Sequence, residues 1–179
     1  MTKILAFTGS TSPTSINHQL LLHIVSRITS YPIEVEDLRT LDIPIYNIVR
    51  EKEGIPSEVK YLYEKIQDFP ALIIAVNEYN NNVSGFFKNV LDWLSRVDRK
   101  FLQEKKIMII STSPGRRGGA AALEYCKFQF PRFGGEVVES FSLPQFYENY
   151  DVEKDQVTNE VFEMGIVEVL TDFEQQIRS

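Results

Sequence analysis

The fold is decided by the stretch ALIIAV, Ala71 to Val76, and by NEYNNNVSGFFKNVLDWLSR, Asn77 to Arg96, which follows it directly. The first part is apolar at every position, which is typical of a strand buried on both faces of a parallel sheet. The second part contains four asparagines near its start and then, from about Ser84 to Arg96, apolar residues at helical spacing. The sequence therefore predicts a buried strand, a polar loop and a helix in that order.

The same alternation of short apolar runs and helical segments continues on both sides of this stretch. Further strands are predicted at 4–7, 33–36, 107–110 and 136–138, and further helices at 16–28, at 57–66, from 119 onward and at 162–177. Strands that alternate with helices through right-handed crossovers form a doubly wound α/β sheet. Five strands favour the order 2-1-3-4-5 with helices on both faces. We expect one domain over residues 1–179, with loops at 42–55 and 147–155.

Composition and charge limit the kind of partner. Hydrophobic residues make up 43% of the chain, and the net charge is −6, which argues against a nucleic-acid partner because such proteins usually carry a basic surface. No apolar run approaches the roughly 20 residues of a membrane-spanning helix, and the apolar run near the N-terminus is too short for a signal peptide. The chain has one cysteine, Cys126, which fits a reducing cytoplasm. One cysteine and two histidines are too few ligands for a typical zinc site.

A ligand site is expected at one edge of this sheet. In such sheets a ligand binds beyond the carboxyl ends of the strands, where the strand order reverses. The loops that leave the first, third and fourth strands should therefore form one site. The first of these loops, Gly9 to Asn17, contains five hydroxyl side chains immediately before a helix. The N-terminus of a helix attracts phosphate, so the loop predicts a phosphate site, with a simple helix cap as the alternative.

The other two loops are also unusual. Asn77 to Gly85 combines four asparagines with Tyr79, and amides can bind the edge of a planar heterocycle while a tyrosine stacks on its face. A plain turn is the alternative, because asparagine favours turns. Thr112 to Gly119 contains three glycines, which allow the backbone to approach a ligand closely, or form a flexible connection. The first loop matches neither GxGxxG nor GxxxxGK[ST], which argues against a Rossmann dinucleotide site or an ATP site.

At these three loops the sequence resembles the NADPH-dependent FMN reductase family, a flavodoxin-like group that includes quinone, azo and chromate reductases. The similar segments are GSTSPTSIN (Gly9 to Asn17), EYNNNVSGFFKNVLDWLSR (Glu78 to Arg96) and STSPGRRGG (Ser111 to Gly119). The middle segment is the most specific. The family pattern E-Y-N, a short gap and G-x-x-K-N-x-[LI]-D-W continues here through Gly85, Lys88, Asn89, Asp92 and Trp93.

The resemblance implies a flavodoxin-like fold with bound FMN that passes hydride from NADPH to a small electron acceptor, such as free flavin, a quinone or an azo compound. No catalytic side chain is expected, because the flavin carries the chemistry. The resemblance implies a phosphate site at Ser10, Ser15 and Asn17. It also implies that the ribityl chain and isoalloxazine lie along Glu78, Tyr79 and Asn80 and beside Ser113, Gly115 and Gly118. Ser12, Ile16 and Asn77 complete the expected cofactor-binding set.

Two positions depart from the family pattern. Ser12 stands where many relatives carry a basic residue, which should weaken the binding of phosphate or of the nicotinamide cofactor. Asn77 stands where proline is usual, which removes a rigid element next to the ring.

Arg116 and Arg117 are the expected NADPH contacts, because guanidinium groups suit a 2′-phosphate, although a solvated surface pair is the alternative. Two other functions stay open on the sequence alone. One is a flavodoxin-type FMN electron carrier without an enzymatic acceptor of its own, and the other is a flavodoxin-like protein that has lost flavin.

The helix from Ser84 to Arg96 predicts a homodimer that could assemble further into a homotetramer. Its apolar residues spread over an arc of roughly 160°, whereas a helix that covers a sheet needs about 100°. Surplus apolar surface often marks a partner surface. In the alternative, the loop at 42–55 covers this surplus within one subunit. Relatives in the family form dimers through helices of this region, so the resemblance also favours an interface here.

Overall fold

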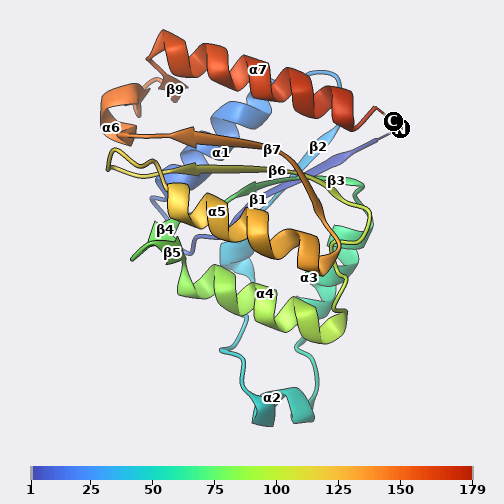
Figure 1. Ribbon diagram of the computed structural model, residues 1–179. Helices are drawn as coiled ribbons and strands as arrows, with labels where there is room; N and C mark the ends of the chain where they lie inside the picture. The colour runs from blue at the N-terminus through green and yellow to red at the C-terminus, as the bar shows by residue number, and fades with distance from the viewer. Residues whose placement is uncertain (1, 179) are drawn as a thin grey trace.

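The computed structural model describes residues 2–178 and contains a five-stranded parallel sheet with helices on both faces (Figure 1). The strands of the sheet are β1 (Ile4–Thr8), β2 (Ile33–Glu36), β3 (Ala71–Ala75), β6 (Lys106–Thr112) and β7 (Glu136–Leu143). Their order in the sheet is β2-β1-β3-β6-β7, and every neighbouring pair is parallel. This is the predicted order 2-1-3-4-5, so the fold class is confirmed.

The central strands divide the core into two layers. Leu5 and Phe7 of β1 pack with α3 (Ser57–Gln67), α4 (Gly85–Val97) and α5 (Ala120–Gln129). Ile4 and Ala6 of the same strand pack with α1 (Ile16–Ser26) and α7 (Glu160–Gln176). Figure 1 shows these two groups of helices on opposite faces of the sheet. Within the described residues, no helix is both long enough and apolar enough to cross a membrane.

Segments that were expected to be irregular contain short elements. The loop at 42–55 projects from the body of the molecule and carries α2 (Ile48–Glu53), after the short 3-10 helix η1 (Leu38–Thr40) (Figure 1). The fifth strand runs five residues beyond its predicted end at 138, because residues 139–143 pair with β6. The remaining elements are η2 (Phe130–Phe133), α6 (Phe146–Asn149) and an antiparallel pair, β8 (Tyr150–Asp151) with β9 (Gln156–Val157).

The apolar face of α4 is buried within a single chain. Its five largest core side chains are each at most 4% exposed, namely Phe87, Val90, Leu91, Trp93 and Leu94. The loop at 42–55 covers the outer part of the helix. Trp93 Nε1 donates a hydrogen bond to Pro44 O at 2.7 Å, and the Tyr46 ring packs edge-on against Trp93 at 5.2 Å. The expectation of a surplus apolar arc on this helix was therefore wrong, and the alternative that the loop covers it is confirmed.

Candidate active site

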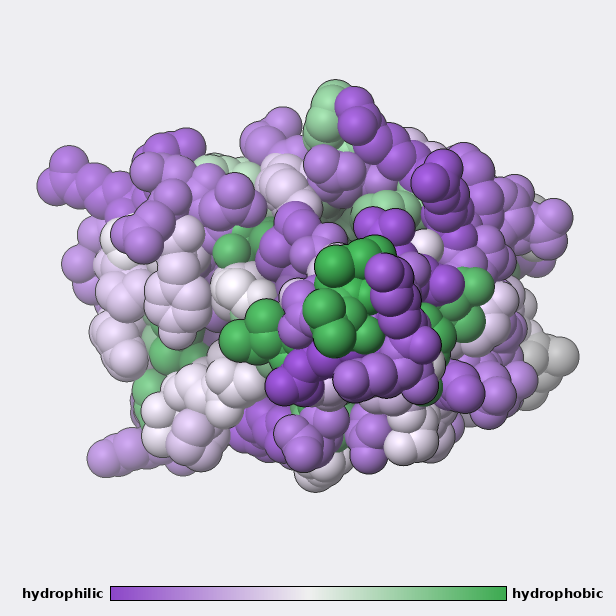
Figure 2. Space-filling view, turned by 90° about the horizontal axis from the view of Figure 1, so that it is seen from below, coloured by the Kyte–Doolittle hydropathy of each residue, from purple (hydrophilic) through white to green (hydrophobic). Residues whose placement is uncertain are grey.

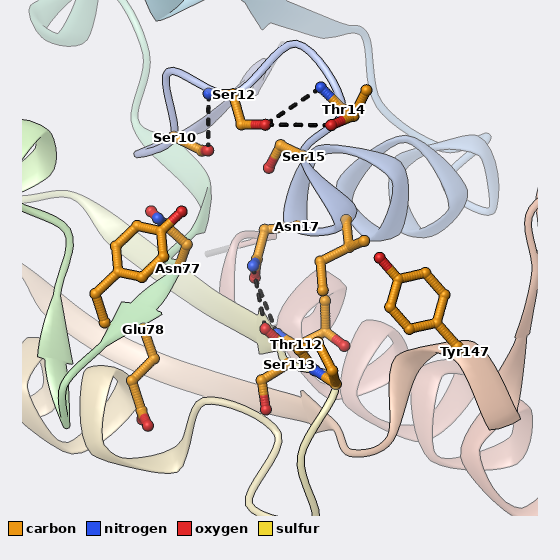
Figure 3. Close-up of a pocket in the computed structure, with 13 residues that line it drawn as sticks. Ser10, Ser12, Thr14, Ser15, Asn17, Asn77, Glu78, Thr112, Ser113 and Tyr147 are labelled. Carbon is orange, nitrogen blue, oxygen red and sulfur yellow. Dashed lines mark hydrogen bonds between the residues drawn. The ribbon is translucent and has the colours of Figure 1, made fainter.

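A cavity of about 220 Å³ opens at the carboxyl edge of the sheet, where the loops after β1, β3 and β6 meet (Figure 3). Nine residues of the expected cofactor set line it: Ser10, Ser12, Ser15, Ile16, Asn17, Asn77, Glu78, Tyr79 and Ser113. Four lining residues lie outside that set, namely Thr14, Thr112, Pro114 and Tyr147. Asn80, Gly115 and Gly118, which were also expected there, are not part of the lining. The three loops that the sequence singled out therefore converge on one cavity.

The first loop is shaped by its own hydroxyl groups. Ser15 is the N-cap of α1, since its Oγ accepts a hydrogen bond from His18 N at 3.2 Å. Ser10 Oγ accepts from Ser12 N at 3.2 Å, and Ser12 Oγ accepts from Thr14 N at 3.3 Å. Helix capping, the alternative left open by the sequence, is thus one role of this loop. The same contacts hold the N-terminus of α1 at the cavity, where unpaired backbone N–H groups attract anions.

Asn17 joins the first loop to the third. Its Nδ2 donates to Thr112 O at 3.1 Å, and its Oδ1 accepts from Thr112 N at 2.9 Å. The side chain is buried, and Figure 3 shows both hydrogen bonds at the centre of the site. The Asn17 carboxamide therefore sets the distance between the two loops.

The second loop is a β-hairpin of β4 (Glu78–Tyr79) with β5 (Asn82–Val83). Its two turn residues, Asn80 and Asn81, have φ values of 51° and 60°. A two-residue hairpin turn of type I′ needs positive φ at both positions, which asparagine tolerates better than most residues. Two of the four asparagines are thus explained by the turn, the alternative that the sequence left open for this loop.

The Glu78 side chain turns away from the cavity. Its Oε2 accepts hydrogen bonds from Ala121 N at 2.8 Å and Ala122 N at 3.2 Å, in the first turn of α5. The N-cap of α5 is Gly119, which has no side chain that could do this. A second contact joins the same loops, since Arg117 Nη1 donates to Asn81 Oδ1 at 3.2 Å. The hairpin is therefore fixed to the third loop and α5.

Asn77 leaves one polar atom of the site without a partner. The residue is 6% exposed and lines the cavity, and its Oδ1 has no hydrogen-bond partner. A water-sized group in the cavity does not reach this oxygen, so it is a buried acceptor that the fold leaves unpaired and not a contact offered to a ligand. Two other buried side-chain atoms among residues 2–178 share this condition, His18 Nδ1 and Gln19 Oε1, but neither residue lines the cavity.

Tyr147 lines the cavity and was not predicted from the sequence. It follows β7, is 66% exposed, and stands on the side of the cavity opposite Asn77 and Glu78 (Figure 3). Its segment is tied to the third loop, because Gln145 N donates to Gly115 O and Phe146 N donates to Ser113 O, both at 3.0 Å. The available signal was the fifth strand, whose carboxyl end lies beside that of the fourth in the predicted order.

Positive charge is absent from the described lining of the cavity, which includes neither lysine nor arginine. Arg116 and Arg117 are exposed on the third loop but are not among the lining residues. His18, in the first turn of α1, adds little charge. Burial and the nearby Arg39 guanidinium lower the pKa of this imidazole, and Asp37 only partly opposes them. An anionic group in the cavity would therefore be held by neutral donors and by the helix N-terminus.

The model of the NADPH-dependent FMN reductase family matches residues 2–148. This chain belongs to that family. The matched region contains every residue that lines the cavity, Tyr147 included. The resemblance seen in the three loops is thereby confirmed.

Individual relatives agree with this assignment. A quinone reductase of Escherichia coli K12 is 30% identical over an alignment of 181 positions, which covers 94% of this chain and 89% of the relative. An NAD(P)H-dependent FMN reductase of Pseudomonas aeruginosa is 33% identical over 121 residues, covering 67% and 64%. Among solved structures, the flavoenzyme NAD(P)H:(acceptor) oxidoreductase FerB of Paracoccus denitrificans superposes with a TM-score of 0.73 at 25% identity, covering 98% of both chains.

Proposed function

We propose that this chain binds FMN in the cavity and is an NADPH-dependent oxidoreductase that reduces a small acceptor, either a quinone or a free flavin. The observation that carries the proposal is the convergence of three loops on a cavity that combines the N-terminus of α1 with the hydroxyl groups of the first loop. Membership of the family and the likeness to a quinone reductase support the activity. When bound, FMN supplies the hydride and electron transfer between the nicotinamide and the acceptor.

The first loop would hold the FMN phosphate. Ser10, Ser12 and Ser15 place hydroxyl groups at the cavity, and Ile16 and Asn17 bring the first backbone N–H groups of α1. Together with the absence of lysine and arginine from the described lining, this makes a phosphate site built on neutral donors.

The second and third loops would hold the isoalloxazine ring. Tyr79 is 61% exposed, which leaves its ring free to stack on a planar ligand. A Cβ atom on Gly115 would meet only Ser113 Oγ, at 3.8 Å, so this glycine leaves open space for a ligand. Gly118 is required by the fold instead, because its φ is 56° and a Cβ would lie 2.2 Å from Ser142 Oγ. Glu78 and Asn80 would act indirectly, by shaping the hairpin.

The absorption spectrum of the purified protein, with and without added FMN, tests this proposal. We expect about one FMN per subunit, reduction of the bound flavin by NADPH, and ping-pong turnover with a quinone, since donor and acceptor use the same ring face in turn. Bound FMN that NADPH reduces only slowly would favour a flavodoxin-type electron carrier. Failure to take up FMN would favour a protein that has lost flavin, and would overturn the proposal.

We further propose that the chain forms a homodimer or homotetramer through the projecting loop at 42–55. Ile45, Ile48 and Val49 are 79%, 60% and 63% exposed, and α2 has no buried residue. Figure 2 views the molecule from the side on which α2 projects, and hydrophobic residues gather near the middle of that face. Exposed apolar side chains that lie together often mark a partner surface, and a second copy of this chain is the partner that we infer for these three.

A further inference from the structure

Tyr147 brings a polar group to the cavity that the fold itself does not use. Its side chain is 66% exposed and lines the cavity, and its hydroxyl forms no hydrogen bond with any residue between 2 and 178. Figure 3 shows this hydroxyl pointing into the site, toward the start of α1. A phenolic O–H can both donate and accept a hydrogen bond. The group is therefore open to a ligand in the cavity.

The backbone that carries Tyr147 is held firmly in place. After β7, Gln145 adopts a left-handed conformation with φ 49° and ψ 56°, which is uncommon for a residue with a side chain. Such conformations persist where the surrounding structure enforces them, and they are frequent at sites that hold a ligand. Here Gln145 N donates to Gly115 O and Phe146 N donates to Ser113 O, both at 3.0 Å. The turn therefore fixes the direction of the residues that follow it.

Contacts within this segment place Tyr147 beside α1 and away from the hairpin. The Phe146 ring is fully buried, stacks on the Tyr150 ring at 4.6 Å and meets the Tyr147 ring edge-on at 5.4 Å. The Tyr150 hydroxyl donates to Gln19 O, in the first turn of α1, at 3.3 Å. The hairpin that begins at Glu78 lies on the opposite side of the cavity (Figure 3). In the proposed site, the first loop and α1 hold the phosphate and the hairpin lies along the ring, so Tyr147 is on the phosphate side.

We infer that the Tyr147 hydroxyl donates a hydrogen bond to the FMN phosphate and so contributes to selection of FMN over riboflavin. This inference rests on the proposed FMN site. The described lining of the cavity has no lysine or arginine, so a phosphate there depends on backbone N–H groups and on hydroxyl donors. A hydrogen bond to a charged oxygen is stronger than one between neutral groups. The Tyr147 phenol would thus replace part of the binding that a basic residue at the position of Ser12 supplies in many relatives.

A comparison of two flavins isolates the phosphate contact. Riboflavin has the ring and the ribityl chain of FMN but no phosphate, so the ratio of its Kd to that of FMN measures what the phosphate contributes. Each flavin would be titrated into the apoprotein by fluorescence quenching. The test variant is Tyr147→Phe, which keeps the ring and removes only the hydroxyl. The matched control is Tyr63→Phe, because Tyr63 lies on α3, outside the cavity lining, and its hydroxyl donates to Asp98 at 3.4 Å.

We expect Tyr147→Phe to raise the Kd for FMN about tenfold, which corresponds to one lost hydrogen bond to a charged group, and to change the Kd for riboflavin by less than about twofold. Tyr63→Phe should change neither Kd by more than about twofold. The urea midpoint of the Tyr147→Phe apoprotein should match that of the wild type, because the hydroxyl has no hydrogen-bond partner within residues 2–178. A loss confined to FMN therefore separates a phosphate contact from a general disturbance of the fold.

Three results would overturn the role of Tyr147. They are an unchanged Kd for FMN in Tyr147→Phe, an equal rise in the Kd values for FMN and riboflavin, and a rise in Tyr63→Phe as large as that in Tyr147→Phe. If the wild-type protein bound neither flavin, the proposed function itself would fail. If it bound FMN and Tyr147→Phe kept the wild-type ratio of the two Kd values, only the assignment of Tyr147 would fail.

Discussion

Asn17 shows how one side chain can serve the site by holding other groups in place. Replacing it with alanine removes two hydrogen bonds and leaves the backbone N–H and C=O of Thr112 without these partners in a buried position. We expect Asn17→Ala to lower the free energy of unfolding by about 2–3 kcal/mol, measured by urea denaturation of the apoprotein. Asn82→Ala, at an exposed position, should cost less than about 0.5 kcal/mol. Equal stability of the two variants would contradict the bridging role.

Arg116 and Arg117 are adjacent, but only a change of Arg116 tests nicotinamide binding without also removing a contact to the hairpin. Arg117 donates a hydrogen bond to Asn81, so its removal also loosens the hairpin. Arg116 is exposed on the same loop. If its guanidinium binds the 2′-phosphate, Arg116→Ala should raise the KM for NADPH about tenfold and the KM for NADH by less than about twofold. Equal changes in both KM values would show that Arg116 is a solvated surface residue.

Individual residues differ in how far the sequence could place them. Ser10, Ser15 and Asn77 could be placed at the site because each directly follows, or lies a few residues after, a strand whose neighbours the fold class dictates. The orientation of the Glu78 carboxylate could not be foreseen, since it depends on α5 lacking a side-chain cap of its own at Gly119. Tyr147 was missed because the fifth strand was predicted to end at 138 rather than at Leu143.

At the scale of elements, the first turn of α5 is capped by a distant side chain, since Glu78 lies 43 positions before Ala121, whose N–H it accepts. Glu78→Ala would leave the N–H groups of Ala121 and Ala122 without this acceptor and remove a negative charge from a helix N-terminus. We expect a loss of about 1–2 kcal/mol in the free energy of unfolding.

Hydrogen exchange at the Ala121 and Ala122 amides should locate this effect, with faster exchange in Glu78→Ala than in the wild type. Glu78→Gln keeps an acceptor oxygen and loses only the charge, so it should recover more than half of the stability. An alanine variant with wild-type exchange at both amides would show that the cap has no energetic role.

Strands that are buried on both faces could be predicted well from the sequence, and exposed elements could be predicted poorly. β3 and β6 are apolar over consecutive residues, a pattern that needs no tertiary context to interpret. The hairpin of β4 and β5 has only two residues per strand, too few for any periodicity, and its turn depends on positive φ at Asn80 and Asn81. The cover that the loop at 42–55 provides for Trp93 is a long-range contact, which helix periodicity cannot reveal.

At the scale of the whole molecule, the net charge of the chain and the lack of lysine and arginine in the described cavity lining predict how FMN binding responds to salt. The chain carries a net charge of −6, and the described lining of the cavity has no lysine or arginine, so the dianionic phosphate of FMN meets repulsion without a compensating cation. Raising the ionic strength from about 20 mM to about 200 mM screens this repulsion and should leave the Kd for FMN unchanged or up to about threefold lower.

Ser12→Arg supplies the matched comparison for this salt dependence. It restores the basic residue of the family pattern, so its FMN affinity should be higher than that of the wild type at low salt and should fall as salt is added. A wild-type Kd that rises with salt would show that a cation, supplied from outside the described lining, contacts the phosphate.

Assembly is also a property of the whole molecule. Because the apolar face of α4 is buried, we expect the subunit interface at the loop at 42–55 and not on α4. Leu91 is buried, so a charge there would unfold the chain rather than report on an interface. Ile48→Glu and Val49→Glu change exposed side chains of α2 and should leave the fold intact. For the wild type, light scattering at micromolar concentration should give a multiple of the 20.7 kDa chain mass.

The two variants on α2 should shift that mass toward 20.7 kDa, because an isologous dimer would bring each new carboxylate close to its symmetry mate. Met164→Glu is the control, since Met164 is 73% exposed on α7, on the opposite face of the sheet from α4. A wild-type mass of 20.7 kDa would refute assembly altogether. A dimer that Ile48→Glu and Val49→Glu leave whole, but that Met164→Glu divides, would place the interface on α7.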